Sequence, residues 1–189
     1  VLPEPEGPPV VVMASRLLRD KGVLEFVAAA KLLHERGLPA RFWLAGGPDL
    51  ANPASVSLQE IEIWKTEGIV ECLGHHVDVP YLYAQAHIVA LPSYREGLPK
   101  SLIEAAACGR PVVTTDVPGC RDAIKPDVTG LLVPARDVES LALALERLIR
   151  DSELRQTMGK AGRTFAKSEF DVDQVVSKHL QIYKDLLGP

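Results

Sequence analysis

Two glutamates, Glu96 and Glu104, are separated by seven residues in the segment YREGLPKSLIEAAACGRPVV. A packed core needs neither carboxylate, whereas ionised carboxylates accept hydrogen bonds from the hydroxyl groups of a ligand. The pattern predicts a helix over about Pro99 to Cys108, with Pro99 as its first residue because its missing N–H costs nothing there. Glu96 would lie in the preceding loop and Glu104 one to two turns into the helix. The two carboxylates could then approach opposite ends of one ligand.

The start of this predicted helix also suits an anion. The backbone N–H groups of Lys100, Ser101 and Leu102 are expected to point outward, where unpaired helix amides and the helix dipole favour a phosphate. Carboxylates would bind hydroxyls and amides would bind phosphate.

Structural roles for the glutamates stay open from local sequence. Ser101 and Glu104 have the spacing of a capping box, and Lys100 and Glu104 have that of an i,i+4 ion pair. Glu96, beside Arg95, could be a solvated loop residue. The two glutamates become informative only in combination with other loops.

A pair of cations follows the first predicted strand. Arg16 and Lys21 stand five residues apart in SRLLRDKG, ahead of a predicted helix. Two cations beside a helix N-terminus form a plausible cradle for a diphosphate. The alternative is that both are solvated loop charges, as most Lys and Arg residues are.

The loops after the next two predicted strands carry weaker signals. LAGGPD offers only Gly46-Gly47, and neither GxGxxG nor GxxxxGK[ST] occurs, which disfavours a dinucleotide coenzyme or a P-loop nucleotide. In LGHHVDV, the adjacent His75 and His76 lack further ligands at metal spacing, so zinc is not expected. His76 and Val77 are better suited to form a wall beside the flat base of a ligand.

Short apolar runs alternate with helical patterns along most of the chain, which predicts an α/β fold. The strands are expected at Val10 to Ala14, Arg41 to Ala45, Ile69 to Leu73, Ile88 to Leu91, Val112 to Thr115 and Gly130 to Val133. The other helices are expected at about Val23 to Arg36, Ser57 to Glu67, Val79 to Ala86 and Val138 to Asp151. Strands apolar on both faces indicate a Rossmann-like parallel sheet with helices on both sides. In such a sheet, ligands bind beyond the carboxyl ends of the strands.

The chain is expected to divide into three parts. Residues 1–9, rich in proline and acid, are typical of an interdomain linker, and residues 10–168 would form the Rossmann-like domain. Residues 169–189 would form a C-terminal helix with an apolar stripe that must pack against another surface.

Composition excludes several classes of function. At 189 residues and 47% hydrophobic, the chain can form a substantial core, and its net charge of −4 without a basic run argues against nucleic acid as a partner. Cys72, Cys108 and Cys120 are expected to be buried reduced thiols, which favours the cytoplasm. No stretch approaches the roughly 18 apolar residues of a membrane span.

In combination, these loops resemble the C-terminal, donor-binding domain of family 4 retaining glycosyltransferases, the glycosyl transferases group 1 with the GT-B fold. The resemblance runs from about Val10 to Arg163 through SRLxxxKG, LAGGP, CLGHHVDVPYLYAQAHIVALPS, the glutamate motif, VPGCRDAI and TGLLVPARDVESLALALERLI, in the family's order. EGLPKSLIEA and TDVPGCRD look most like bacterial enzymes of surface polysaccharide biosynthesis.

The resemblance implies roles for these residues. Arg16 and Lys21 would grip the diphosphate and stabilise the departing nucleoside diphosphate in place of a metal, so no metal or cofactor is expected. Glu96 would bind donor-sugar hydroxyls and help to position the anomeric carbon, and Glu104 would hold the ribose. The backbone of Gly97, Leu98, Pro99, Lys100, Ser101 and Leu102 would line the sugar and phosphates, with His76 or Val77 near the base.

It also implies partners outside this sequence. An N-terminal domain would bind the acceptor, a glycan or lipid-linked sugar, and could bring a cytoplasmic enzyme to the inner face of the membrane. The C-terminal helix, residues 169–189, would cross back to that domain. The donor would be a nucleotide sugar, UDP-linked by family frequency, carrying a hexosyl or N-acetylhexosaminyl group. The isolated domain should bind donor but be inactive.

Two departures and two alternatives accompany the resemblance. Many relatives have glycine where this chain has Pro99, and glutamate is commoner than Asp122. The alternative functions are a GT-B nucleotide-sugar epimerase or phosphorylase, and a non-catalytic interaction module that inherited the fold.

Overall fold

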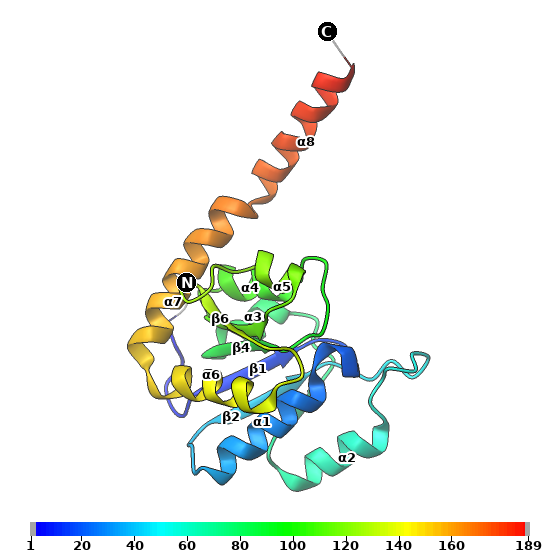
Figure 1. Ribbon diagram of the computed structural model, residues 1–189, viewed down its shortest axis with the longest axis vertical. Helices are drawn as coiled ribbons and strands as arrows, with labels where there is room; N and C mark the ends of the chain where they lie inside the picture. Colours follow the sequence, from blue (N-terminus) through cyan, green and yellow to red (C-terminus); the bar gives the residue numbers. More distant parts are fainter. Residues whose placement is uncertain (1–2, 188–189) are drawn as a thin grey trace.

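The computed structural model, which describes residues 3–187, contains a six-stranded parallel sheet with helices on both sides (Figure 1). The strand order is β3-β2-β1-β4-β5-β6, and every neighbouring pair is parallel. The strands are β1 (Val10–Ala14), β2 (Arg41–Ala45), β3 (Glu71–Gly74), β4 (Ile88–Leu91), β5 (Val112–Thr115) and β6 (Gly130–Val133). Strands β4 and β5 are wholly buried, which explains their continuous apolar or small side chains.

Helices connect the strands and extend the chain beyond the sheet. They are α1 (Val23–Glu35), α2 (Leu58–Glu67), α3 (Val79–Ala84), α4 (Lys100–Ala107), α5 (Pro118–Asp122), α6 (Val138–Arg150), α7 (Ser152–Glu169) and α8 (Val172–Leu187), with a 3-10 helix η1 (Arg19–Lys21). Helix α1 packs against α6, and α4 packs against α7.

The strand order places a reversal between β1 and β4. The chain first moves outward from β1 to β2 and β3, then returns to β4 and moves the other way to β6. Because crossovers are right-handed, α1 and α2 cover one face while α3 and α4 cover the other. A reversal of this kind opens a crevice at the carboxyl ends of the strands.

Most expected elements are present, and three local predictions were wrong. Strand β3 begins at Glu71 rather than Ile69. Pro99 is not the first helical residue but the N-cap of α4, because its backbone is extended at φ −73 and ψ 111. Cys72 and Cys108 are only half-buried, whereas Cys120 is fully buried.

The segment before β1 packs against the domain. Pro5 O lies 3.0 Å from His87 Nε2, and the Glu4 carboxylate pairs with Arg155 at 3.0 Å. Residues 1 and 2 of the expected linker lie outside the described part of the chain. The linker and domain limits therefore stay predictions.

Helix α8 leads away from the sheet and forms the far end of the molecule (Figure 1). None of its residues is buried, and its apolar side chains, including Val172, Ile182 and Leu186, are exposed. The apolar stripe predicted from the sequence is therefore present but covered by no other described element. Residues 188 and 189 lie outside the described residues.

Helix α7 approaches the rest of the domain closely at glycines. A Cβ at Gly159 would lie 2.1 Å from Gly109 O, so only glycine permits this contact. A Cβ at Gly162, one turn further on, would lie 3.5 Å from the Ala106 side chain, an ordinary contact. The two positions offer a matched test of the packing.

We expect Gly159→Ala to lower the free energy of unfolding by about 1–3 kcal/mol, because backbone must move to admit the methyl group. Gly162→Ala should leave it unchanged or raise it by up to about 1 kcal/mol through helix propensity. Urea unfolding of both variants measures the difference. Equal stability of the two would contradict the close approach of α7 to Gly109.

Candidate functional site

Backbone hydrogen bonds join the loops that follow β1, β2 and β3. Ser15 N donates to Ala45 O at 3.0 Å, and Leu17 N donates to Gly47 O at 3.0 Å. Gly46 N in turn donates to Gly74 O at 2.7 Å. The three loops therefore form one continuous rim at the carboxyl ends of the strands.

A cavity of about 570 Å³ opens along this rim. It is within the size range of small-molecule sites. Its lining consists of Ala14, Ser15, Arg16, Ala45, Gly46, Gly47, Pro48, Asp49, His75, His76 and Val79. The structure thus brings together Arg16 and His76, while Val77 is 93% exposed and lies outside this lining.

Arg16 is held by a partner that the sequence did not single out. Its Nη1 lies 3.0 Å from Asp49 Oδ2, and its side chain is 63% exposed. Exposed pairs of this kind contribute little stability. An anionic ligand can therefore replace Asp49 at small cost, which leaves Arg16 available for binding.

Lys21 and Glu96, predicted as ligands from separate loops, contact each other. Lys21 Nζ lies 2.6 Å from Glu96 Oε1, and the two side chains are 21% and 13% exposed. The carboxylate predicted to lie in the loop before α4 is therefore partly buried against a cation. This pair joins the loop after β1 to the loop after β4.

The same two loops are locked by their backbones. Gly22, which ends η1 at φ +75, leaves no room for a side chain because a Cβ would lie 2.1 Å from Pro92 O. Tyr94 N and Ser93 Oγ both donate to Asp20 O, at 2.8 and 3.0 Å. Lys21 is thus held directly beside the loop that carries Glu96.

Helix α5, which the sequence did not reveal, supports the loop from the other side. A Cβ on Gly119 would lie 2.1 Å from Gly97 O and 2.3 Å from Glu96 O. The Thr115 hydroxyl donates to Ser93 O. The position of Glu96 is therefore fixed by β5 and α5 as well as by Lys21.

Tyr94 is a further anchor that sequence reasoning missed. Its hydroxyl donates to Glu25 Oε1 at 2.6 Å, and the Arg136 guanidinium lies 4.5 Å from the ring centroid. Burial and the Glu25 carboxylate raise the pKa of Tyr94 to about 12. The phenol therefore stays protonated at neutral pH and can keep donating to Glu25.

Helix α4 places Glu104 toward α3. Burial raises the pKa of the Tyr83 hydroxyl, and the nearby Glu104 carboxylate raises it further. Because Tyr83 belongs to α3, Glu104 faces the helix that follows the His75-His76 loop. Glu104 is nevertheless absent from the cavity lining given above.

The structural alternatives for Glu104 fail. Pro99, not Ser101, is the N-cap of α4, and no side chain caps it, so the capping box is absent. Among residues 3–187, no ion pair joins Lys100 to Glu104.

The predicted ring of amides is smaller than expected. Leu102 N donates to Pro99 O at 3.1 Å and is satisfied within the turn. Lys100 and Ser101 occupy the first two helical positions, where a helix provides no backbone acceptor. Two of the three predicted amides therefore remain suited to a phosphate.

Within the described residues, no group of three or more His, Cys, Asp or Glu side chains could hold a metal ion. In the same part of the chain, no helix is both long and apolar enough to cross a bilayer.

Comparisons with known proteins place these loops in one family. Residues 1–165 match the family described as Glycosyl transferases group 1. The chain is 34% identical over 175 residues to the N,N'-diacetylbacillosaminyl-diphospho-undecaprenol alpha-1,3-N-acetylgalactosaminyltransferase of Campylobacter jejuni, covering 93% of this chain and 44% of that protein. It is 29% identical over 174 residues to the capsular polysaccharide biosynthesis glycosyltransferase CapM of Staphylococcus aureus, covering 91% and 44%.

A solved structure shares the fold. Anabaena Alr3699/HepE, crystallised with UDP and glucose, superposes with a TM-score of 0.80 at 25% identity and covers 94% of this chain and 48% of that one. The predicted Rossmann-like sheet with a helical tail is confirmed. The chain spans less than half the length of each of these proteins.

We expect the Lys21–Glu96 pair to stabilise the domain more than an exposed pair does. In a double-mutant cycle to alanine, the coupling free energy should be about 1–3 kcal/mol, because each single change leaves a partly buried charge without its partner. The exposed Lys65–Glu62 pair, 2.6 Å long, should give only about 0.2–0.5 kcal/mol. Urea unfolding measures both cycles. Equal coupling free energies for the two pairs would contradict the larger contribution of the Lys21–Glu96 pair.

Proposed function

The chain belongs to the glycosyl transferases group 1 family, and on that premise we propose that it is the donor-binding half of a nucleotide-sugar-dependent retaining glycosyltransferase of family 4. The observation that carries the proposal is the ion pair between Lys21 Nζ and Glu96 Oε1, 2.6 Å apart, on the rim that also bears Arg16. A cation that can bind phosphate therefore lies next to a carboxylate that can bind hydroxyls, and a sugar ester of diphosphate carries both groups.

Arg16 and Lys21 bind the diphosphate of the donor. As the bond between the anomeric carbon and the diphosphate breaks, negative charge grows on the departing oxygens. Cations held beside those oxygens stabilise the transition state more than the ground state. These side chains take the role that a metal ion has in other transferases, so the proposed reaction needs no metal.

Glu96 accepts hydrogen bonds from hydroxyl groups of the donor sugar and so positions its anomeric carbon. The neighbouring Lys21 contacts one oxygen of the Glu96 carboxylate, Oε1. This contact orients the carboxylate, and a carboxylate has lone pairs on both oxygens for further donors. The sugar is thereby placed next to the cation that receives its leaving group.

Glu104 accepts hydrogen bonds from the ribose hydroxyls, and the backbone from Gly97 to Leu102 lines the sugar and phosphates. His76 lies near the base, which occupies the cavity between the loops after β1, β2 and β3, whereas the exposed Val77 lies outside that cavity. Retention of configuration follows from attack by the acceptor on the same face that the diphosphate leaves.

The relatives support a substrate class. One is named for transfer of N-acetylgalactosamine to a lipid-linked sugar, and another for capsular polysaccharide biosynthesis. HepE was crystallised with UDP and glucose. We propose a UDP-linked hexose or N-acetylhexosamine as donor and a glycan or lipid-linked sugar as acceptor, in bacterial surface polysaccharide biosynthesis.

The acceptor would bind through an N-terminal domain that this sequence does not contain. That domain would also bring a cytoplasmic enzyme to the inner face of the membrane. By itself, the present chain should bind the donor without transferring sugar.

We expect Arg16→Ala and Glu104→Ala each to weaken UDP binding by about 1–3 kcal/mol, since each removes a charge-assisted hydrogen bond. Isothermal titration calorimetry measures the change. Arg41→Ala and Glu67→Ala are matched controls, because Arg41 pairs with Glu71 and Glu67 with Lys31, away from the rim cavity. Both controls should bind UDP as the unchanged chain does.

Circular dichroism confirms the fold of each variant. Wild-type affinity in the folded Arg16→Ala and Glu104→Ala proteins would contradict the assigned roles. Absence of UDP and GDP binding by the unchanged chain would contradict the donor-binding proposal itself.

A further inference from the structure

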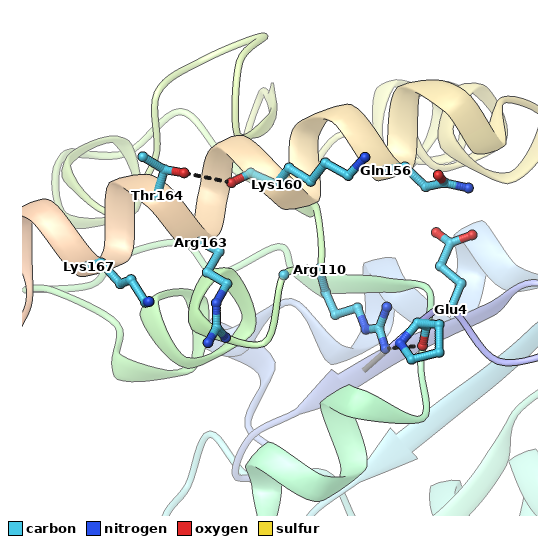
Figure 2. Close-up of a pocket in the computed structure, with 9 residues that line it drawn as sticks. Glu4, Arg110, Gln156, Lys160, Arg163, Thr164 and Lys167 are labelled. Carbon is cyan, nitrogen blue, oxygen red and sulfur yellow. Dashed lines mark hydrogen bonds between the residues drawn. The ribbon is translucent and has the colours of Figure 1, made fainter. Parts of the chain in front are cut away.

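A second and larger cavity, of about 780 Å³, lies between α7, the segment before β1 and the turn before β5 (Figure 2). Its lining consists of Pro3, Glu4, Gly109, Arg110, Gln156, Lys160, Arg163, Thr164 and Lys167. None of these residues belongs to the candidate donor site.

The cavity lies on the opposite rim of the sheet from the donor loops. Glu4 precedes β1 and Arg110 precedes β5, so both stand at the amino ends of their strands. The donor loops follow the carboxyl ends. Because all the strands are parallel, the two cavities lie at opposite ends of the strands.

The lining is strongly basic in a chain whose net charge is −4. It contains four cations, Arg110, Lys160, Arg163 and Lys167, and one carboxylate, Glu4. The three from α7 are spaced at intervals of three and four residues, which places them along one face of the helix. Figure 2 shows Arg163 and Lys167 projecting from α7 toward the chain segments beneath it.

Hydrogen bonds and close packing hold the two arginines of the lining in place. Arg110 is only 2% exposed, and its guanidinium donates to Tyr83 O, Ala84 O and Pro3 O at 3.2, 2.5 and 3.0 Å. Arg163 Nη1 donates to Ala107 O at 2.5 Å. The close contact of Gly159 with Gly109 O fixes α7 against the same turn. These anchors hold two guanidinium groups at the cavity.

The one carboxylate in the lining, Glu4, does not neutralise the four cations of the cavity. Both oxygens of Glu4 are engaged by Arg155, at 3.0 and 3.1 Å. Burial lowers the pKa of Arg110, and the Glu4 charge offsets this lowering only in part. An anion in the cavity would stabilise the charged form of Arg110 and attract Lys160 and Lys167.

We propose that this cavity binds a phosphate-bearing anion. The ammonium groups of Lys160 and Lys167 can donate to the charged oxygens of a phosphate, and the two anchored guanidinium groups add positive charge beside them. The cavity is much larger than a phosphate ion, so the ligand is a phosphate ester with an organic body. A soluble phosphate ester and the headgroup of an anionic phospholipid share this chemistry.

Calorimetric titration with pyrophosphate at low salt tests the proposal, with UDP present at saturation so that the proposed donor site is already occupied. Lys160→Ala/Lys167→Ala should weaken binding by about tenfold or more, since two charged donors are lost. The charge-matched control, Lys31→Ala/Lys65→Ala, removes two lysines of α1 and α2 and should bind normally.

Vesicle sedimentation separates the two ligand sources. Lysine-dependent binding to phosphatidylglycerol vesicles, with none to phosphatidylcholine vesicles, assigns the site to a lipid headgroup. Lysine-dependent binding of pyrophosphate without vesicle binding assigns it to a soluble ester. Failure of both probes, or binding that Lys160→Ala/Lys167→Ala leaves unchanged, overturns the proposal.

Discussion

The ion pair between Lys21 and Glu96 joins two loops whose paired residues are 75 positions apart in the chain, and the candidate site depends on it. A parallel sheet brings the carboxyl ends of its strands to one rim, but does not by itself fix how the loops meet there. Gly22 and Gly119 supply that constraint, since each admits a backbone that any side chain would exclude. Cation and acid are consequently held together before any ligand arrives.

Preorganisation of this kind is what the proposed chemistry requires. A leaving group that gains negative charge is stabilised most by donors that need not move during the reaction. Lys21 satisfies this condition because Asp20, its neighbour in η1, accepts hydrogen bonds from Ser93 and Tyr94. Arg16 differs, since its exposed pair with Asp49 can open when a diphosphate binds.

The two rims of the sheet carry different chemistry. On the donor rim, two carboxylates pair with two cations, Asp49 with Arg16 and Glu96 with Lys21, which suits a ligand with hydroxyls and phosphates. On the opposite rim, the cations of α7 and Arg110 outnumber the one carboxylate. Helix α7 leads directly toward α8, whose apolar side chains are uncovered by any other described element.

The sequence predicted the parts of the fold that depend on periodicity. Strands such as Val10–Ala14 are apolar on both faces, and helices such as Val138–Arg150 repeat apolar residues at helical spacing, so both patterns are visible locally. The three-residue η1 and five-residue α5 are too short to show a period. Close approach at Gly119 leaves no local trace either, because it depends on a distant backbone.

Contacts between charged residues were the least predictable part of the site. Lys21 and Glu96 were each expected to bind a ligand, but their direct contact arises only once β1 and β4 are neighbours. Asp49 and Tyr94 were missed because neither stands at a recognisable spacing. The extended backbone of Pro99 shifted the start of α4 by one residue, and the turn it forms satisfies Leu102 N.

A crystal structure of this chain with UDP bound tests the central claim most directly. The account predicts the diphosphate beside Arg16 and Lys21, the ribose at Glu104 and the base in the cavity lined by His75 and His76. UDP bound elsewhere, with Lys21 and Glu96 still paired and no ligand at that rim, would contradict it.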